Sequence, residues 1–199
     1  MRFAALALSL LTAWPAFARE TSFEAVAQGA EKVDALEPFL ASYVGRCTDV
    51  YEHQRCEANV ATIRRQVSGR TFAVRVTDAA GLVRPERRSS GYLILLTPFV
   101  DGGGLALTNG VPTRQDASGR PLIDLLAIPG AVPVGMMDLE YESPFRTGAI
   151  ELEIVFRPEK VWRLSRRGEK GSYEGVAARF LAVRIIDART GNPIAARVM

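Results

Sequence analysis

The spacing of apolar residues divides the chain into a helical first part and a strand-rich second part. Between residues 19 and 69, apolar side chains recur every three or four positions, the period of a helix with one buried face. From Arg70 onward they recur at every second position, the period of a strand with one buried face. Because strands and helices do not alternate, this order predicts an α+β protein that is mainly β.

Two or three helices are expected before residue 70. The first should begin at a capping box formed by Thr21 and Glu24, in which each side chain binds the other residue's amide. Pro38 lacks an N–H group, so it should kink or split this helix. A second helical element should run from Cys47 to Gly69, with its apolar side chains along one stripe.

The clearest strand pattern lies in residues 149–186. Residues 149–156 alternate between large apolar side chains and polar ones. Turns are predicted at Pro158–Glu159 and in the Gly-rich residues 168–171, which would divide the stretch into three antiparallel strands. Residues 193–197 should form an edge strand that begins with proline. We therefore expect N-terminal helices packed on an antiparallel β-sandwich or a partly open barrel.

The first residues have the composition of an export signal. Residues 1–18 combine a positive start, an apolar stretch and the A-x-A cleavage site Ala16-Phe17-Ala18. We expect cleavage after Ala18 and residence in the bacterial periplasm or outside the cell. No later apolar run approaches the roughly 20 residues of a transmembrane helix. The helical segment 19–69 and the β domain 70–199 are expected to pack as one globular unit.

Two cysteines, Cys47 and Cys56, form one pair in a chain predicted to reach an oxidising compartment. Their spacing is not the C-x-x-C of a thiol oxidoreductase, and no second pair exists for a zinc site. The pattern therefore predicts a structural disulfide, worth roughly 2–3 kcal/mol in the chain-entropy treatment.

The charge of the chain argues against nucleic-acid binding. Its net charge is +3, and it falls to +2 when Arg2 is removed with the signal peptide. A basic cluster near a Gly- and Pro-rich stretch could instead contact an envelope protein or an anionic lipid. The possible contact residues are this cluster and two aromatic residues near loop ends: Arg84, Arg87, Arg88, Phe99 and Phe145.

Catalytic and metal-binding candidates are few. His53 is the only histidine, and it lies near Asp49, Glu52 and Glu57 without a G-x-S-x-G or S-x-x-K nucleophile motif. These four side chains are typical of an exposed helix start, so we predict no metal, no cofactor and no catalytic group among them. Acidic residues alternate along two later strands and include Asp138, Glu140, Glu142, Glu151 and Glu153. Such a row is typical of a solvated sheet face neutralised by cross-strand arginines, although paired carboxylates also serve glycoside hydrolysis.

Several short segments of the sequence together resemble those of one protein family. They are Gln66–Phe72, Leu96–Phe99 with Gly103–Thr108, and Val155–Pro158 with Val161–Leu164. In these the chain resembles an uncharacterised family of secreted bacterial proteins of unknown function. The resemblance implies an exported protein with paired cysteines between helices, and it implies no activity and no site residue.

The sequence favours a non-enzymatic envelope protein that binds a partner or assists its assembly. Two alternatives stay open. A lipid or small-ligand carrier would require a barrel with an unfilled interior. A carboxylate-dependent hydrolase would require a residue such as Asp138 or Glu140 in a pocket that raises its pKa.

Overall fold

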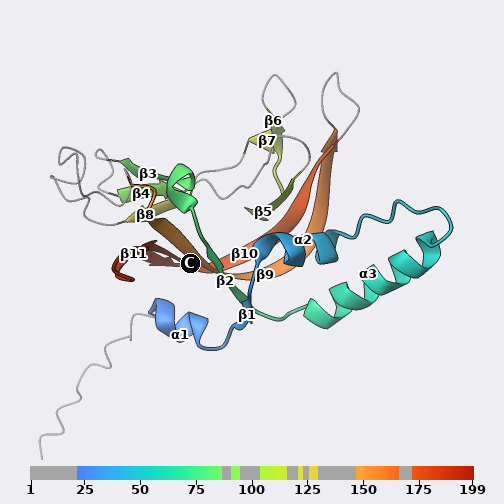
Figure 1. The fold of residues 1–199 in the computed structure, drawn as a ribbon, viewed down its shortest axis with the longest axis horizontal. Coiled ribbons are helices and arrows are strands. Elements are labelled where there is room, and N and C mark those ends of the chain that lie inside the picture. Colours follow the sequence, from blue (N-terminus) through green and yellow to red (C-terminus); the bar gives the residue numbers. More distant parts are fainter. Residues whose placement is uncertain are drawn as a thin grey trace, which may run out of the picture.

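The structure is a computed structural model of the chain. It describes residues 22–86, 91–94, 104–115, 121–122, 126–129, 147–165 and 172–199. The predicted signal peptide, residues 1–18, lies outside the described residues. Figure 1 shows a long, curled sheet with the helices packed around it.

The main sheet has the strand order β1-β2-β9-β10-β11, and β5 also pairs with β10. Its strands are β1 (Glu31–Val33), β2 (Phe72–Val76), β5 (Leu105–Asn109), β9 (Ile150–Ser165), β10 (Ser172–Asp187) and β11 (Pro193–Val198). The mainly β α+β class is confirmed. The prediction of antiparallel pairing is correct for β2, β9, β10 and β11, whereas β1 pairs parallel with β2 and β5 parallel with β10. Two helices separate β1 from β2, and such a crossover allows the chain to return in the same direction.

Smaller elements lie beside this sheet. The strands are β3 (Val83–Glu86), β4 (Gly91–Ile94) and β8 (Leu126–Pro129), which form a three-stranded sheet, and the pair β6 (Arg114–Gln115) and β7 (Pro121–Leu122). The helices are α1 (Phe23–Ala27), α2 (Leu36–Val44), α3 (His53–Val67) and the 3₁₀ turn η1 (Ala79–Leu82). The three-stranded sheet adjoins the main one where β8 meets β11.

The predicted turn at Pro158–Glu159 is wrong, because β9 continues through it. Pro158 pairs with Ala178 and Lys160 with Ala177, so Glu159 is an extra residue in a β-bulge. A bulge tolerates proline because its residues are not all needed for the hydrogen-bond ladder. A second bulge, at residue 181 of β10, lies between Phe180 and Ala182. Bulges bend a strand, so these two help to curl the β9–β10 hairpin.

The predicted alternation of β9 places its apolar side chains in the main core. Ile150, Leu152, Ile154 and Phe156 are at most 1% exposed. Helix α2 packs on this inner face of the sheet with Leu40 and Tyr43, and Figure 1 shows it lying across the strands. Phe39 adds edge contact with the Phe156 ring, at 5.6 Å between centroids. The inner face is thus covered by α2.

Helix α1 packs on the opposite face and is shorter than predicted. Phe23 lies against Val155 and Ala182, and the guanidinium of Arg184 lies 4.2 Å from the centre of its ring. Ser22, not Thr21, accepts the capping hydrogen bond, from Ala25 N at 3.2 Å. The helix ends at Ala27 because the following residues form β1 and obtain their backbone hydrogen bonds from β2.

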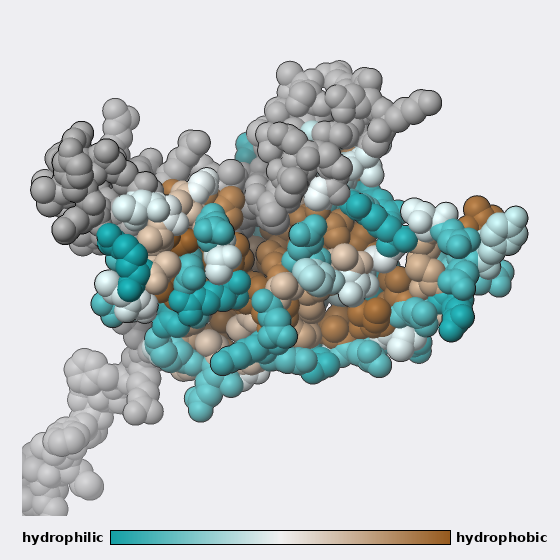
Figure 2. Space-filling model, in the orientation of Figure 1, coloured by the Kyte–Doolittle hydropathy of each residue, from teal (hydrophilic) through white to brown (hydrophobic). Residues whose placement is uncertain are grey.

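Helices α2 and α3 form an antiparallel pair, but only α2 is buried against the sheet. Pro38 lies in the first turn of α2, where its missing N–H is not needed, and Gly45 ends the helix with φ 63°. Helix α3 begins at His53, six residues later than predicted. None of its residues is buried, and Figure 1 shows it extending away from the sheet. Figure 2 shows apolar surface between the charged side chains of this region.

Candidate functional site

A cleft lies between α3, the end of α2 and the far half of β9. Its volume is about 540 Å³, which is within the range of small-molecule sites. Helix α3 supplies one wall, with side chains spaced three and four residues apart, and β9 supplies the other. The lining residues are Val44, Gly45, Cys47, His53, Glu57, Val60, Ala61, Arg64, Val161 and Arg163.

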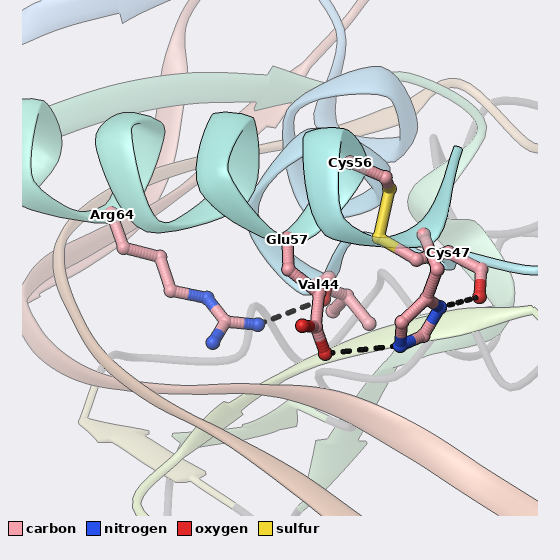
Figure 3. The surroundings of a disulfide bond; sticks show 6 residues. Val44, Cys47, Cys56, Glu57 and Arg64 are labelled. Atoms are coloured by element: carbon pink, nitrogen blue, oxygen red, sulfur yellow. Dashed lines mark hydrogen bonds and ion pairs between the residues drawn. A yellow bond between two sulfur atoms is a disulfide. The ribbon is translucent and has the colours of Figure 1, made fainter. Parts of the chain in front are cut away.

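The disulfide fixes the end of this cleft, and the predicted bridge between Cys47 and Cys56 is present. Their Cα atoms are 5.7 Å apart, within the usual range for a disulfide. The bridge joins the residues after α2 to the first turn of α3 (Figure 3). His53 Nδ1 lies 3.1 Å from the Cys47 carbonyl oxygen. The start of α3 is therefore held by one covalent bond and one hydrogen bond.

Gly45 allows the two helices to come together. Its φ of 63° belongs to the left-handed region that glycine adopts easily. A Cβ atom there would lie 2.1 Å from Cγ2 of Val60, so a larger residue would push α3 outward. Val60 thus packs directly on the backbone at the end of α2.

Arg64 connects the last turn of α3 to the carboxyl end of α2. Its Nε donates to the Tyr43 carbonyl at 2.9 Å, and its Nη2 donates to the Val44 carbonyl at 2.8 Å. A cation at the carboxyl end of a helix also interacts favourably with the helix dipole. The guanidinium lies 5.9 Å from the centre of the Tyr43 ring, whose hydroxyl pKa is raised by burial. Arg64 is therefore fixed in place before any ligand binds.

Glu57 and His53 lie on the same side of α3 as Arg64. The Glu57 carboxylate is 3.2 Å from His53 Nε2, and both side chains are exposed. Figure 3 shows Glu57 and Arg64 projecting from the helix in the same direction. The described residues contain no group of three or more His, Cys, Asp or Glu side chains that could hold a metal ion. Asp49 accepts a hydrogen bond from Tyr51 N at 2.8 Å, in the loop before α3.

The opposite wall carries a second fixed arginine. Arg163 on β9 donates from Nε to the Glu174 carboxylate on β10 at 2.9 Å. Glu174 is a buried charged residue, and Arg46, just after α2, binds its other oxygen. A buried carboxylate needs such partners, so Glu174 holds both arginines in place.

The cleft therefore combines positive charge with apolar surface. Two arginines and one glutamate line it, which gives a net charge of +1 when His53 is neutral. Val44, Val60 and Val161 supply the apolar part. Among the described residues that line the cleft, Cys47 is the only one of hydroxyl or thiol type, and its sulfur is in the disulfide. Positive charge beside apolar surface suits the binding of an anion.

Most of the contact residues predicted from the sequence lie outside the described part of the chain. The backbone of Arg84 lies in β3, paired with Leu93. The other predicted contacts lie outside the described residues, as do the hydrolase candidates; they are Arg87, Arg88, Phe99, Phe145, Asp138, Glu140 and Glu142. The basic cluster therefore stays a prediction.

Glu151 and Glu153, predicted to lie on a solvated face, pair with cross-strand arginines and are partly buried. Glu151 pairs with Arg75 of β2, and Glu153 pairs with Arg184 of β10. Arg75 comes from β2, which lies on one side of this half of β9, and Arg184 comes from β10, which lies on its other side. In the described part of the chain, no helix is long and apolar enough to cross a membrane.

Sequence reasoning did not identify Arg64 and Arg163 as parts of one site. A signal existed for the helical wall, because His53, Glu57, Ala61 and Arg64 follow one another at steps of four, four and three. No sequence signal indicates that Arg163 faces this stripe, since their proximity depends on the packing of α2 between them.

One family model matches the chain. It is described as "Family of unknown function (DUF6066)" and matches residues 1–198. No curated protein and no solved structure matches the chain.

Proposed function

The chain belongs to this family of unknown function, and we propose that it is an exported, non-enzymatic binding module of the bacterial envelope that holds its ligand or partner in the cleft between α3 and β9. The cleft itself carries the proposal. Two arginines fixed by backbone carbonyls and by a buried carboxylate face it beside apolar side chains. Prearranged groups of this kind lower the entropy lost on binding.

Export is supported by the sequence and by the disulfide. Residues 1–18 have the composition of a Sec signal peptide with a cleavage site after Ala18. The bridge between Cys47 and Cys56 is of a kind that persists in oxidising compartments. A fractionation of cells that produce the full chain, with mass measurement of its amino terminus, tests both the compartment and the cleavage site.

The two alternative functions have less support. A carrier with its ligand inside a barrel would need an unfilled inner face, whereas Leu40, Tyr43 and Phe156 fill that face in the described part of the sheet. A hydrolase would need a carboxylate whose pKa is raised in a pocket. No described residue supports a hydrolase, so the cleft remains the best-supported site.

Site-specific photo-crosslinking in cells tests the proposal. A benzoylphenylalanine in place of Ala61 would point into the cleft, and the same replacement at Ala58 gives a matched control. Both alanines are exposed on α3, but only Ala61 lines the cleft. We expect a discrete adduct in the envelope fraction from position 61 and none from position 58. No adduct at either position, or the same adduct at both, would contradict the proposal.

A further inference from the structure

We propose that the ligand of the cleft is an amphiphilic anion, namely a single carboxylate or phosphate head group on an apolar chain. The head group would lie between Arg64 and Arg163, with the chain against Val44, Val60 and Val161. This inference rests on the proposed function, since it names the ligand class of the same cleft.

Arg64 supplies the first half of the head-group site. Arg64 donates hydrogen bonds from Nε and Nη2, both to carbonyls of α2. Arginine has five N–H donors in a planar fork, so Nη1 and the second Nη2 hydrogen remain for a ligand oxygen. The two carbonyls also hold the guanidinium in one orientation, so little side-chain entropy is lost when an anion binds.

Arg163 supplies the second half from the facing strand. Its Nε is bound to Glu174, which leaves the Nη groups to face the cleft that this residue lines. The single negative charge of Glu174 is shared between Arg163 and Arg46, so it does not neutralise both arginines. Two arginines and one carboxylate in this group leave a net positive charge at the β9 wall.

The rest of the lining favours an amphiphile over a bare ion. Three valines and Ala61 flank the charged groups, and a free inorganic anion would leave them in water. A volume of about 540 Å³ exceeds what a phosphate or acetate ion fills. Burial of an apolar chain against these side chains adds about 0.8 kcal/mol per CH₂ group, a roughly fourfold gain in affinity for each.

Glu57 restricts the charge of the ligand. Its carboxylate lines the cleft on the same side of α3 as Arg64 and is bound to His53. A like charge near the head group weakens anion binding, so the cleft should prefer a single negative charge over several. Removal of the Glu57 charge should therefore tighten binding, whereas removal of an arginine from the cleft should weaken it.

Calorimetry on the mature, disulfide-bonded protein tests the ligand class. The probes are decanoate and methyl decyl phosphate, two monoanions that share an apolar chain and separate the two sources of negative charge. Decanamide keeps the chain without the charge, decyltrimethylammonium reverses the charge, and acetate and inorganic phosphate keep the charge without the chain. We expect one or both anionic amphiphiles to bind at least tenfold more tightly than every control.

Three pairs of variants locate the site. Arg163→Gln should weaken decanoate binding by about tenfold, whereas Arg179→Gln, which removes an exposed arginine of β10 elsewhere, should not. Ala61→Trp should block binding and Ala58→Trp should not, since only Ala61 lines the cleft. Glu57→Gln should tighten binding by about twofold to fivefold, and Glu37→Gln on α2 should leave it unchanged. A thermal unfolding curve of each variant verifies that it is folded.

The results separate this inference from the proposed function. Equal binding of decanoate, decanamide and the cationic detergent, or binding that Ala61→Trp leaves intact, would overturn the inference. A crosslinked partner at position 61 in cells, together with no binding of anionic amphiphiles, would also overturn it and leave the proposed function standing. If neither the crosslinking nor the calorimetry gives its expected result, both the proposed function and this inference are contradicted.

Discussion

Gly175 of β10 packs tightly against Ala106 of β5 and Trp162 of β9. A Cβ atom on it would be 2.3 Å from the Ala106 carbonyl oxygen and 2.7 Å from Cζ2 of Trp162. The first neighbour is backbone and cannot rotate away, so Gly175→Ala must separate β5 from β10. We expect a loss of about 2 kcal/mol in the free energy of unfolding, measured by urea titration.

The fluorescence of Trp162 gives a second measurement of the effect of Gly175→Ala. It is the only tryptophan after the predicted cleavage site, so its fluorescence reports this contact alone in the mature protein. Gly29→Ala is the matched control, because nothing lies within 4 Å of the added Cβ and its φ is not positive. Its unfolding free energy should stay within about 0.5 kcal/mol of the parent. Equal effects of the two substitutions would contradict the proposed crowding at Gly175.

The turn before β11 should give a small, pH-dependent contribution to stability. The Arg189 side chain donates to Asp187, and this hydrogen bond, with the backbone N–H of Arg189, holds the pKa of the Asp187 carboxyl below its ordinary value. A lowered folded-state pKa stabilises the protein above the unfolded pKa of about 3.9, and the gain disappears as the pH falls through the folded pKa.

Replacement of Arg189 should therefore matter only at higher pH. We expect Arg189→Gln to lower the free energy of unfolding by about 0.5 kcal/mol at pH 6. Near pH 2.5 the difference should decrease, because Asp187 then gains a proton in both proteins. Chemical denaturation at the two pH values measures this. A difference that grows toward acid would show that the interaction is not with the ionised carboxylate.

The two helices of the hairpin differ in what holds them. Helix α2 has buried side chains on the sheet, whereas α3 has none and depends on the disulfide, on Arg64 and on the contact of Val60 with Gly45. Replacement of Cys47 and Cys56 by alanine should therefore loosen α3 and leave the sheet intact. The closed loop, with a sequence separation of 9, corresponds to about 3 kcal/mol in the chain-entropy treatment.

Hydrogen exchange measures this difference at the level of the element. We expect faster exchange of amides in residues 53–67 of the Cys47→Ala, Cys56→Ala protein, and unchanged protection in residues 150–156 of β9. Addition of a reductant to the parent protein should reproduce the result. Protection lost equally in both segments would mean that α3 unfolds only with the whole molecule.

Local patterns predicted those elements whose structure depends on near neighbours in the chain. Alternation gave the inward face of β9, and Gly69 gave the end of α3 to within two residues, because both are set by residues a few positions apart. Pro158 was misleading, because proline favours a turn locally and a bulge is accommodated only when β10 is already paired alongside. β1 shows the same effect. The sequence pattern predicts a helix there, but pairing with β2 stabilises a strand.

The candidate site shows the same limit. Its disulfide followed from the count and spacing of two cysteines, and its helical wall from a repeat of three and four. The other wall comes from β9, a hundred residues away, and is brought there by α2. No pattern within α3 or within β9 contains that information, so the pairing of Arg64 with Arg163 required the structure.

At the scale of the whole molecule, one core joins the N-terminal helices to the sheet. Leu40 of α2 is fully buried and belongs to the same cluster as Phe72 of β2, Leu107 of β5 and Ile185 of β10. Elements that share one core unfold together, so α2 and the β domain should behave as a single cooperative unit.

Leu40→Ala tests this unity, because it removes side-chain volume at the contact between the two segments. We expect the free energy of unfolding to fall by about 3 kcal/mol. The unfolding transition should shift equally in far-UV circular dichroism, which reports on helices and strands throughout the chain, and in the fluorescence of Trp162 in the sheet. Ile63→Ala on α3 is the control, since Ile63 is only partly buried and should cost about 1 kcal/mol or less. If Leu40→Ala shifted the dichroism transition and left the Trp162 transition in place, the helices would be a separate folding unit. Coincident shifts would instead mean that α2, which lies between the two walls of the cleft, unfolds together with the sheet.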